Sequence, residues 1–119
     1  MSKQKKVNVL INFQVEGLHY WLEAEKTLPE VGYLSSKHRH MFHIKCKKSV
    51  SHSNRDIEFI IFKRDVLDYL NKNYYNATYR SCLFNEMSCE MIGRELLDEF
   101  KLNYCSVFED NENGAEIYV

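Results

Sequence analysis

Apolar and polar residues alternate in two long stretches of the chain. In residues 7–16 the apolar positions recur every second residue, which is typical of a strand with one buried face. Residues 38–50 alternate in the same way, and we expect this second strand to pair antiparallel with the first. The connecting residues 20–36 follow no period and contain Pro29, the only proline, so they predict a long loop.

The middle of the chain has the period of helices. Residues 56–61 predict a short extended segment, and apolar spacings of four, three and one predict a helix over residues 62–73. Ser88 is a favourable N-cap for a second helix that ends near Lys101. Residues 74–87 fit neither pattern. The predicted buried stripe of the second helix consists of Cys89, Ile92, Leu96 and Phe100.

Two further strands are predicted at the end of the chain, over residues 103–109 and 115–119. Between them, residues 110–114 read Asp-Asn-Glu-Asn-Gly, which is a strong turn signal. The order strand-strand-helix-helix-strand-strand predicts an α+β fold, with a four-stranded antiparallel sheet and both helices on one face. The length of 119 residues predicts a single domain over residues 1–119.

The charge of the chain is balanced. Sixteen lysines and arginines face 17 acidic residues, for a formal net charge of -1. Affinity for nucleic acid comes from excess positive charge, so we expect no nucleic-acid partner. No apolar run approaches the roughly 20 residues that cross a bilayer, so we expect no membrane partner either.

The four cysteines indicate the compartment. None of them has C-x-x-C spacing, and the first residues do not contain the apolar core of a signal peptide. We therefore expect reduced thiols and a cytoplasmic protein. The cysteines are Cys46, Cys82, Cys89 and Cys105.

The histidines are the first candidates for chemistry. His38 and His40 share one face of a strand, with Cα atoms about 6.8 Å apart at a rise of ~3.4 Å per residue. His19 lies at the end of the first strand, in phase with its buried positions, so an antiparallel neighbour could bring it beside the pair. Three neutral imidazoles leave a fourth position open on zinc, as in catalytic sites. The alternative is that all three are polar surface residues, and we expect His43 and His52 to be structural or exposed.

Six short motifs follow one another along nearly the whole chain. They are Phe13 to His19, His38-Arg39-His40-Met41-Phe42, Ile57-Glu58-Phe59, Ser88-Cys89-Glu90, Cys105 to Glu109, and Ala115-Glu116-Ile117-Tyr118. In order and spacing they resemble the 6-pyruvoyltetrahydropterin synthase / 6-carboxytetrahydropterin synthase family, which has the tunnelling fold (T-fold).

The resemblance implies a set of functional residues and partners. It implies zinc bound by His19, His38 and His40, and a pterin or purine-like ligand whose pyrimidine edge is held by Glu109. A carboxylate can accept two hydrogen bonds from such an edge, as it does from arginine. It also implies a homo-oligomer, a trimer or a hexamer, whose sheets close into a barrel. The alternative for Glu109 is a strand-end residue before an acidic turn.

Two proton-transfer groups of the family have no counterpart in this chain. The position of the family's cysteine, four residues before the first histidine of H-x-H, is Leu34, and the nearest preceding acid is Glu30. The family's Asp-His pair is also absent, because residues 70–73 read Leu-Asn-Lys-Asn. The catalytic residues therefore remain unidentified, and the candidate replacements are Tyr20, Glu23, Asp56 and Glu58.

Three functional hypotheses follow from the sequence. The first is a divergent zinc-dependent enzyme of the pterin-synthase type, with lyase or isomerase chemistry on the ligand's side chain. The second is a protein that binds a pterin or nucleotide without turning it over. The third is a structural oligomer in which the histidines are vestigial. Fold resemblance by itself does not decide among them.

Overall fold

Two long antiparallel strands, β1 (Val7–His19) and β2 (His38–Val50), form the centre of the fold. The computed structural model describes residues 5–119, so the first four residues of the predicted domain lie outside it. The predicted antiparallel pairing is confirmed, with Phe13 opposite Ile44 and His19 opposite His38. The first strand continues three residues beyond the predicted range 7–16.

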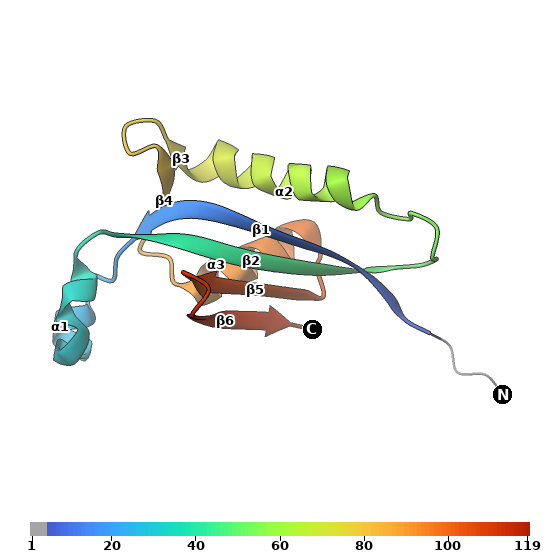
Figure 1. Cartoon of the computed structure of the whole chain (residues 1–119). Coiled ribbons are helices and arrows are strands. Elements are labelled where there is room, and N and C mark those ends of the chain that lie inside the picture. The colour runs from blue at the N-terminus through green and yellow to red at the C-terminus, as the bar shows by residue number, and fades with distance from the viewer. Residues whose placement is uncertain (1–4) are drawn as a thin grey trace.

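The sheet has six strands rather than the predicted four (Figure 1). β5 (Tyr104–Glu109) pairs antiparallel with β2, and β6 (Asn113–Tyr118) pairs with β5. Toward the opposite edge of the sheet, β4 (Ser81–Asn85) runs parallel to β1, and the two-residue β3 (Tyr75–Asn76) pairs with β4. The strand order is therefore β3-β4-β1-β2-β5-β6, and the all-antiparallel prediction is wrong at β4.

The two extra strands lie in residues 74–87, which fitted neither a helix nor a strand pattern. β4 is buried at Ser81, Cys82 and Phe84 and half-buried at Leu83, so it lacks the alternation of a strand with one exposed face. β3 is too short to produce a period. Parallel strands covered on both faces read as continuous buried runs, which a search for alternation does not detect.

The two main helices are α2 (Phe59–Tyr74) and α3 (Cys89–Phe100). α2 starts three residues before the predicted position, because the Glu58 carboxylate accepts a hydrogen bond from the Ile61 backbone N–H at 3.1 Å. Glutamate is not a preferred N-cap residue, so the sequence did not indicate this start. α3 has the predicted Ser88 N-cap, whose hydroxyl accepts from the Met91 N–H at 3.2 Å.

The predicted loop between β1 and β2 contains two short helical segments. These are α1 (Ala24–Thr27) and a 3-10 helix, η1 (Pro29–Ser35), which lie together beyond one end of the sheet (Figure 1). Segments of four and seven residues are too short for an apolar period, so the sequence predicted only a long loop here.

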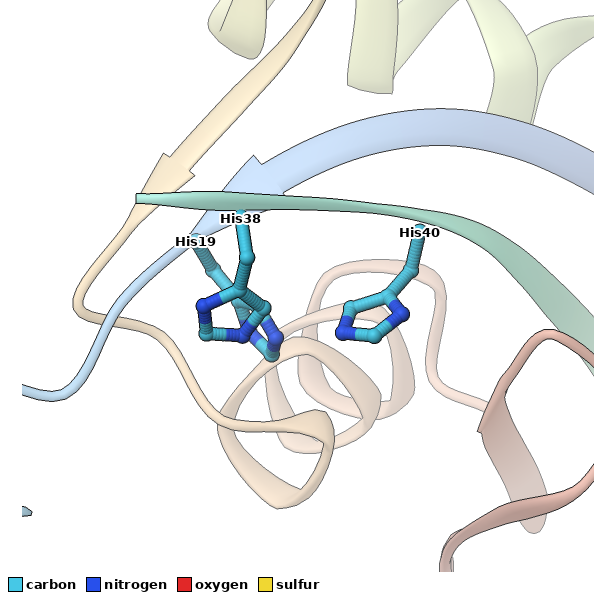
Figure 2. A group of neighbouring side chains, drawn as sticks. All are labelled: His19, His38 and His40. Atoms are coloured by element: carbon cyan, nitrogen blue, oxygen red, sulfur yellow. The ribbon is translucent and has the colours of Figure 1, made fainter. Parts of the chain in front are cut away.

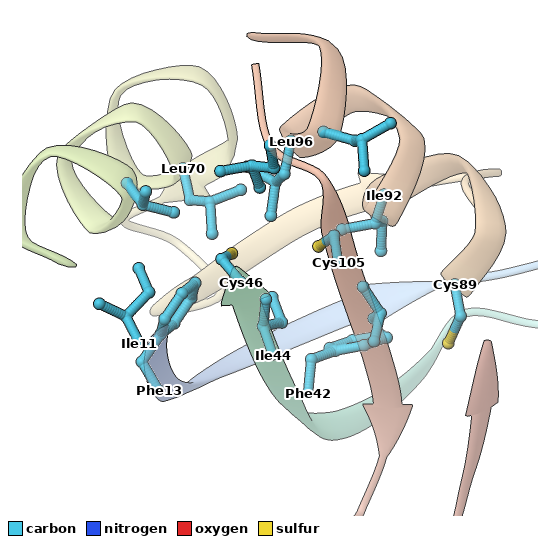
Figure 3. Close-up of a cluster of buried hydrophobic side chains, with 14 of the residues drawn as sticks. Ile11, Phe13, Phe42, Ile44, Cys46, Leu70, Cys89, Ile92, Leu96 and Cys105 are labelled. Carbon is cyan, nitrogen blue, oxygen red and sulfur yellow. The ribbon is translucent and has the colours of Figure 1, made fainter. Parts of the chain in front are cut away.

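One hydrophobic core joins both helices to one face of the sheet (Figure 3). Its strand residues belong to β1, β2, β4 and β5, and its helix residues to the inner faces of α2 and α3. Fully buried members include Phe42, Ile44, Cys46, Leu70, Leu96 and Cys105. His38 and His40 are in phase with Phe42 on β2. The two histidines at the start of this strand therefore lie on the same face as its core residues. Within residues 5–119, no helix is long and apolar enough to cross a membrane.

Candidate metal centre and adjoining cavity

Three imidazoles meet where β1 ends and β2 begins (Figure 2). His19 and His38 are direct partners in the antiparallel ladder, and His40 lies two residues further along β2 on the same face. Their ring centroids are 4.5 Å apart for His19 and His38, 5.3 Å for His19 and His40, and 5.0 Å for His38 and His40. One nitrogen of each ring lies within 4.8 Å of the others, so this group could hold a metal ion.

Each ring is oriented by a hydrogen bond from its Nδ1 atom. His19 Nδ1 lies 2.9 Å from the Met87 carbonyl oxygen, and His38 Nδ1 lies 2.8 Å from the Ser36 carbonyl oxygen. A carbonyl only accepts, so both Nδ1 atoms carry the hydrogen. His40 Nδ1 lies 2.7 Å from Asp110 Oδ2. Hydrogen bonds from Met41 and His40 lower the pKa of Asp110, so this carboxylate is also an acceptor.

These tautomers leave all three Nε2 atoms as lone-pair donors. Metal-binding histidines in proteins characteristically give their other ring N–H to a carbonyl or carboxylate in this way. The Nε2 atoms of His19 and His40 are buried and have no hydrogen-bond partner among residues 5–119. Burial also lowers the pKa of His19, although the Met87 carbonyl and Glu109 oppose this effect. The donor atoms and their orientation therefore fit a divalent metal ion.

Glu109 ends β5 beside the histidines. Its Oε2 atom lies 2.9 Å from His19 Nε2, and its Oε1 atom lies 3.4 Å from His40 Nε2. The Cys89 thiol, from the first residue of α3, donates to Glu109 Oε2 at 3.7 Å. Burial and the neighbouring carboxylate raise the pKa of Cys89 to about 12, so the thiol keeps its proton at neutral pH.

A cavity of about 430 Å³ opens beside the imidazoles. The residues between β4 and α3, together with the start of α3, form one wall, and the first residues after β1 form another. The charged side chains in its lining are Glu86, Glu90 and Glu109, and no lysine or arginine of residues 5–119 lines it. This excess of negative charge favours a cation in the site.

The structure separates the other candidate residues. Tyr20 lines the cavity, as does Leu34, which stands where the family that the motifs resemble has a cysteine. Glu23 does not line this cavity. Asp56 accepts hydrogen bonds from Ser51 in the turn after β2, and Glu58 caps α2. The last two have local roles and are therefore poor candidates for the replacement proton-transfer group.

The remaining histidines lie away from the centre. His43 lines a separate hollow, opposite Phe108 of β5, and its place in the strand puts it on the uncovered face of the sheet. His52 is exposed and lies 3.5 Å from Asp56. Both positions agree with the structural or exposed roles expected from the sequence.

Sequence reasoning missed three parts of the site. The Met87 carbonyl follows β4, which was not predicted, and Asp110 was treated only as a turn residue. The sequence places Cys89 in the buried stripe of α3, and it is buried, but its thiol also faces Glu109 and the cavity. Only the Asp-Asn sequence directly after Glu109 could have indicated the role of Asp110, because both residues tolerate the left-handed conformation of a tight turn.

Comparison with known proteins adds no further constraint. No protein-family model matches the chain, and no curated protein matches it significantly.

Proposed function

We propose that this protein binds zinc through His19, His38 and His40 and uses the metal to hold a pterin or purine-like ligand in the adjoining cavity. The single observation that carries the proposal is the orientation of the three rings. Each Nδ1 atom donates its hydrogen to a carbonyl or a carboxylate, which leaves Nε2 of each ring as the basic nitrogen, and the three rings bring one nitrogen each within 4.8 Å of the others. Neutral imidazole is a good ligand for zinc, and three such ligands are found in catalytic zinc sites.

The pterin or purine-like ligand is supported by the resemblance of the motifs to the pterin-synthase family, and by a cavity whose size is in the range for small molecules. Glu109 lines this cavity with a half-buried carboxylate that can accept two hydrogen bonds from a pyrimidine edge. When bound, zinc would act as a Lewis acid on oxygens of the ligand's side chain. Under this proposal the chain is a divergent member of the T-fold family, and the sheet of one subunit has six strands.

A second candidate function is binding without turnover. Leu34 lines the cavity where the family's cysteine would lie, and the Cys89 thiol, with its raised pKa, is a weak nucleophile at neutral pH. Both observations favour a protein that captures its ligand unchanged. Incubation with 7,8-dihydroneopterin triphosphate, followed by mass spectrometry, separates the two functions. Loss of triphosphate or side chain supports the enzyme, and recovery of unchanged compound from the protein supports the binding protein.

The metal site is tested by removing one ligand. We expect His40→Ala to lose zinc, measured as metal per chain after native purification. His43→Ala is the matched control, because it removes an imidazole three residues away on the other face of β2. Equal zinc content in the wild type and in His40→Ala would contradict the proposed ligand set.

A homo-oligomer belongs to the same proposal. β6 is the outer strand at one side of the sheet, and its Tyr118 is 68% exposed. An unpaired edge promotes association with other strands, and closure of several sheets into a barrel removes it. Light scattering coupled to size-exclusion chromatography should give three or six times the chain mass of 14.2 kDa. A mass of one chain would exclude this assembly.

A further inference from the structure

The position of Glu109 has a consequence beyond ligand recognition. Its two carboxylate oxygens lie against two different imidazoles, at 2.9 Å from His19 Nε2 and 3.4 Å from His40 Nε2. Neither nitrogen forms a hydrogen bond with any residue in the described part of the chain, although both are buried. The carboxylate is therefore close to both nitrogens but forms a hydrogen bond with neither.

This arrangement brings together groups that all carry lone pairs. In the neutral rings the Nδ1 atoms of His19 and His40 hold the hydrogens, so both Nε2 atoms are acceptors, and a carboxylate is an acceptor as well. Acceptors at such short distances repel one another unless a cation lies among them. The same three groups are suitable ligands for one divalent metal ion.

One of the two distances agrees with that interpretation. With zinc–nitrogen bonds of about 2.0–2.1 Å and zinc–oxygen bonds of about 2.0–2.2 Å, neighbouring ligand atoms of a tetrahedral site lie about 3.3–3.5 Å apart. The distance from Glu109 Oε1 to His40 Nε2 falls in this range, and that from Oε2 to His19 Nε2 is shorter. Glu109 is also held from its other side, because the Cys89 thiol donates to Oε2.

We propose that Glu109 is the fourth ligand of the metal in the ligand-free protein. The inference rests on the proposed metal site and adds to it a closed resting state. Closed four-ligand sites are typical of structural zinc, whereas catalytic sites keep a position open. A small molecule that reaches the metal here must first displace the Glu109 carboxylate, which can then hold another part of the same molecule.

Cobalt(II) substitution tests this proposal without an activity assay, because visible absorption bands of cobalt report the number and type of its ligands. We expect Glu109→Gln to shift these bands and to lower metal affinity at least about 10-fold, since loss of even an outer-shell partner costs 10–100-fold. Azide should then change the spectrum of Glu109→Gln at much lower concentration than that of the wild type. Glu112→Gln is the matched control, because it removes the same charge from an exposed residue of the neighbouring turn.

The outcomes distinguish this proposal from the one on which it rests. If Glu109→Gln and the wild type have the same cobalt spectrum and the same response to azide, Glu109 is not a ligand, and the three-histidine site stands alone. If the wild type takes up no cobalt or zinc, the metal site itself is refuted, and this proposal with it. Glu109→Ala serves as a second variant, with circular dichroism to verify that both variants fold.

Discussion

At the scale of single residues, Asp110 is the side chain that connects a turn to the candidate metal centre. Asp110 and Asn111 both have left-handed backbone conformations, with φ of 54° and 56°, and Glu112 N–H donates to the Glu109 carbonyl across them. Aspartate and asparagine tolerate this conformation better than other residues with a Cβ atom. The turn directs one Asp110 oxygen to His40 Nδ1 and the other to the Met41 backbone N–H. A residue that reads as turn chemistry therefore also orients a candidate metal ligand.

We predict that Asp110→Asn weakens zinc binding by about 10–100-fold without removing the site. The amide can still accept a hydrogen bond from His40, but it carries no charge to increase the basicity of the ring. Competition with a chromophoric chelator measures the affinity. Asp98→Asn, on the exposed face of α3, is the matched control. An unchanged zinc affinity in Asp110→Asn would show that the carboxylate has no part in the site.

At the scale of elements, the β5–β6 hairpin and β4 bring the outer parts of the site to the histidines. β4 pairs with the last residues of β1, so the chain after it passes close to His19. The hairpin carries Glu109 and Asp110 and depends on a close approach at Gly114. A Cβ atom there would lie 2.0 Å from the Val107 carbonyl oxygen and 2.6 Å from the Phe108 Cα atom. Since these are backbone atoms, no side-chain rotation relieves the contact.

We therefore expect Gly114→Ala to lower the free energy of unfolding by about 1–3 kcal/mol, the usual cost of forcing extra atoms into a packed site. Urea unfolding followed by circular dichroism measures the change. Gly32→Ala is the control, because its nearest contacts, at 3.4–3.5 Å from Glu25, are ordinary van der Waals distances. Equal losses in the two variants would indicate a general effect of replacing glycine rather than a requirement of the hairpin.

At the scale of the whole molecule, the buried thiols couple stability to pH. All four cysteines are buried as free thiols, from three strands and the start of α3. Burial raises the pKa of Cys82 to about 11, above its ordinary value of 9.0. Between these two pH values the unfolded chain releases the proton while the folded chain keeps it. The ionisation therefore favours unfolding, and this contribution to stability is complete below pH 9 and is lost as the pH rises toward 11.

We predict that the free energy of unfolding decreases steadily from pH 9 to pH 11. Urea titrations at several pH values in this range, under reducing conditions, give the slope. Cys82→Ala should reduce that slope, because it removes one group whose pKa differs between the folded and unfolded chains, even though the variant is less stable at every pH. A wild-type stability independent of pH above 9 would contradict the prediction.

Local patterns in the sequence determined the features that depend on neighbouring residues. The period of two in β1 and β2 located both strands, their mutual pairing and the shared face of His38 and His40. Ser88 located the start of α3, because N-capping involves residues only three apart. The three histidines were also found this way, since His19 lies in phase with the buried face of β1.

Tertiary structure decided the hydrogen bonds of the histidines and the pairing of β4. These contacts join segments far apart in the chain, so neither segment carries a periodic signal of them. The hydrogen bond from His19 to the Met87 carbonyl spans 68 positions, and that from His40 to Asp110 spans 70. β4 is a strand because it pairs in parallel with the end of β1 and antiparallel with β3. The sequence thus identified the three histidines, whereas the fold determines which ring nitrogen carries the hydrogen. The fold also places Glu109 next to the Nε2 atoms of His19 and His40.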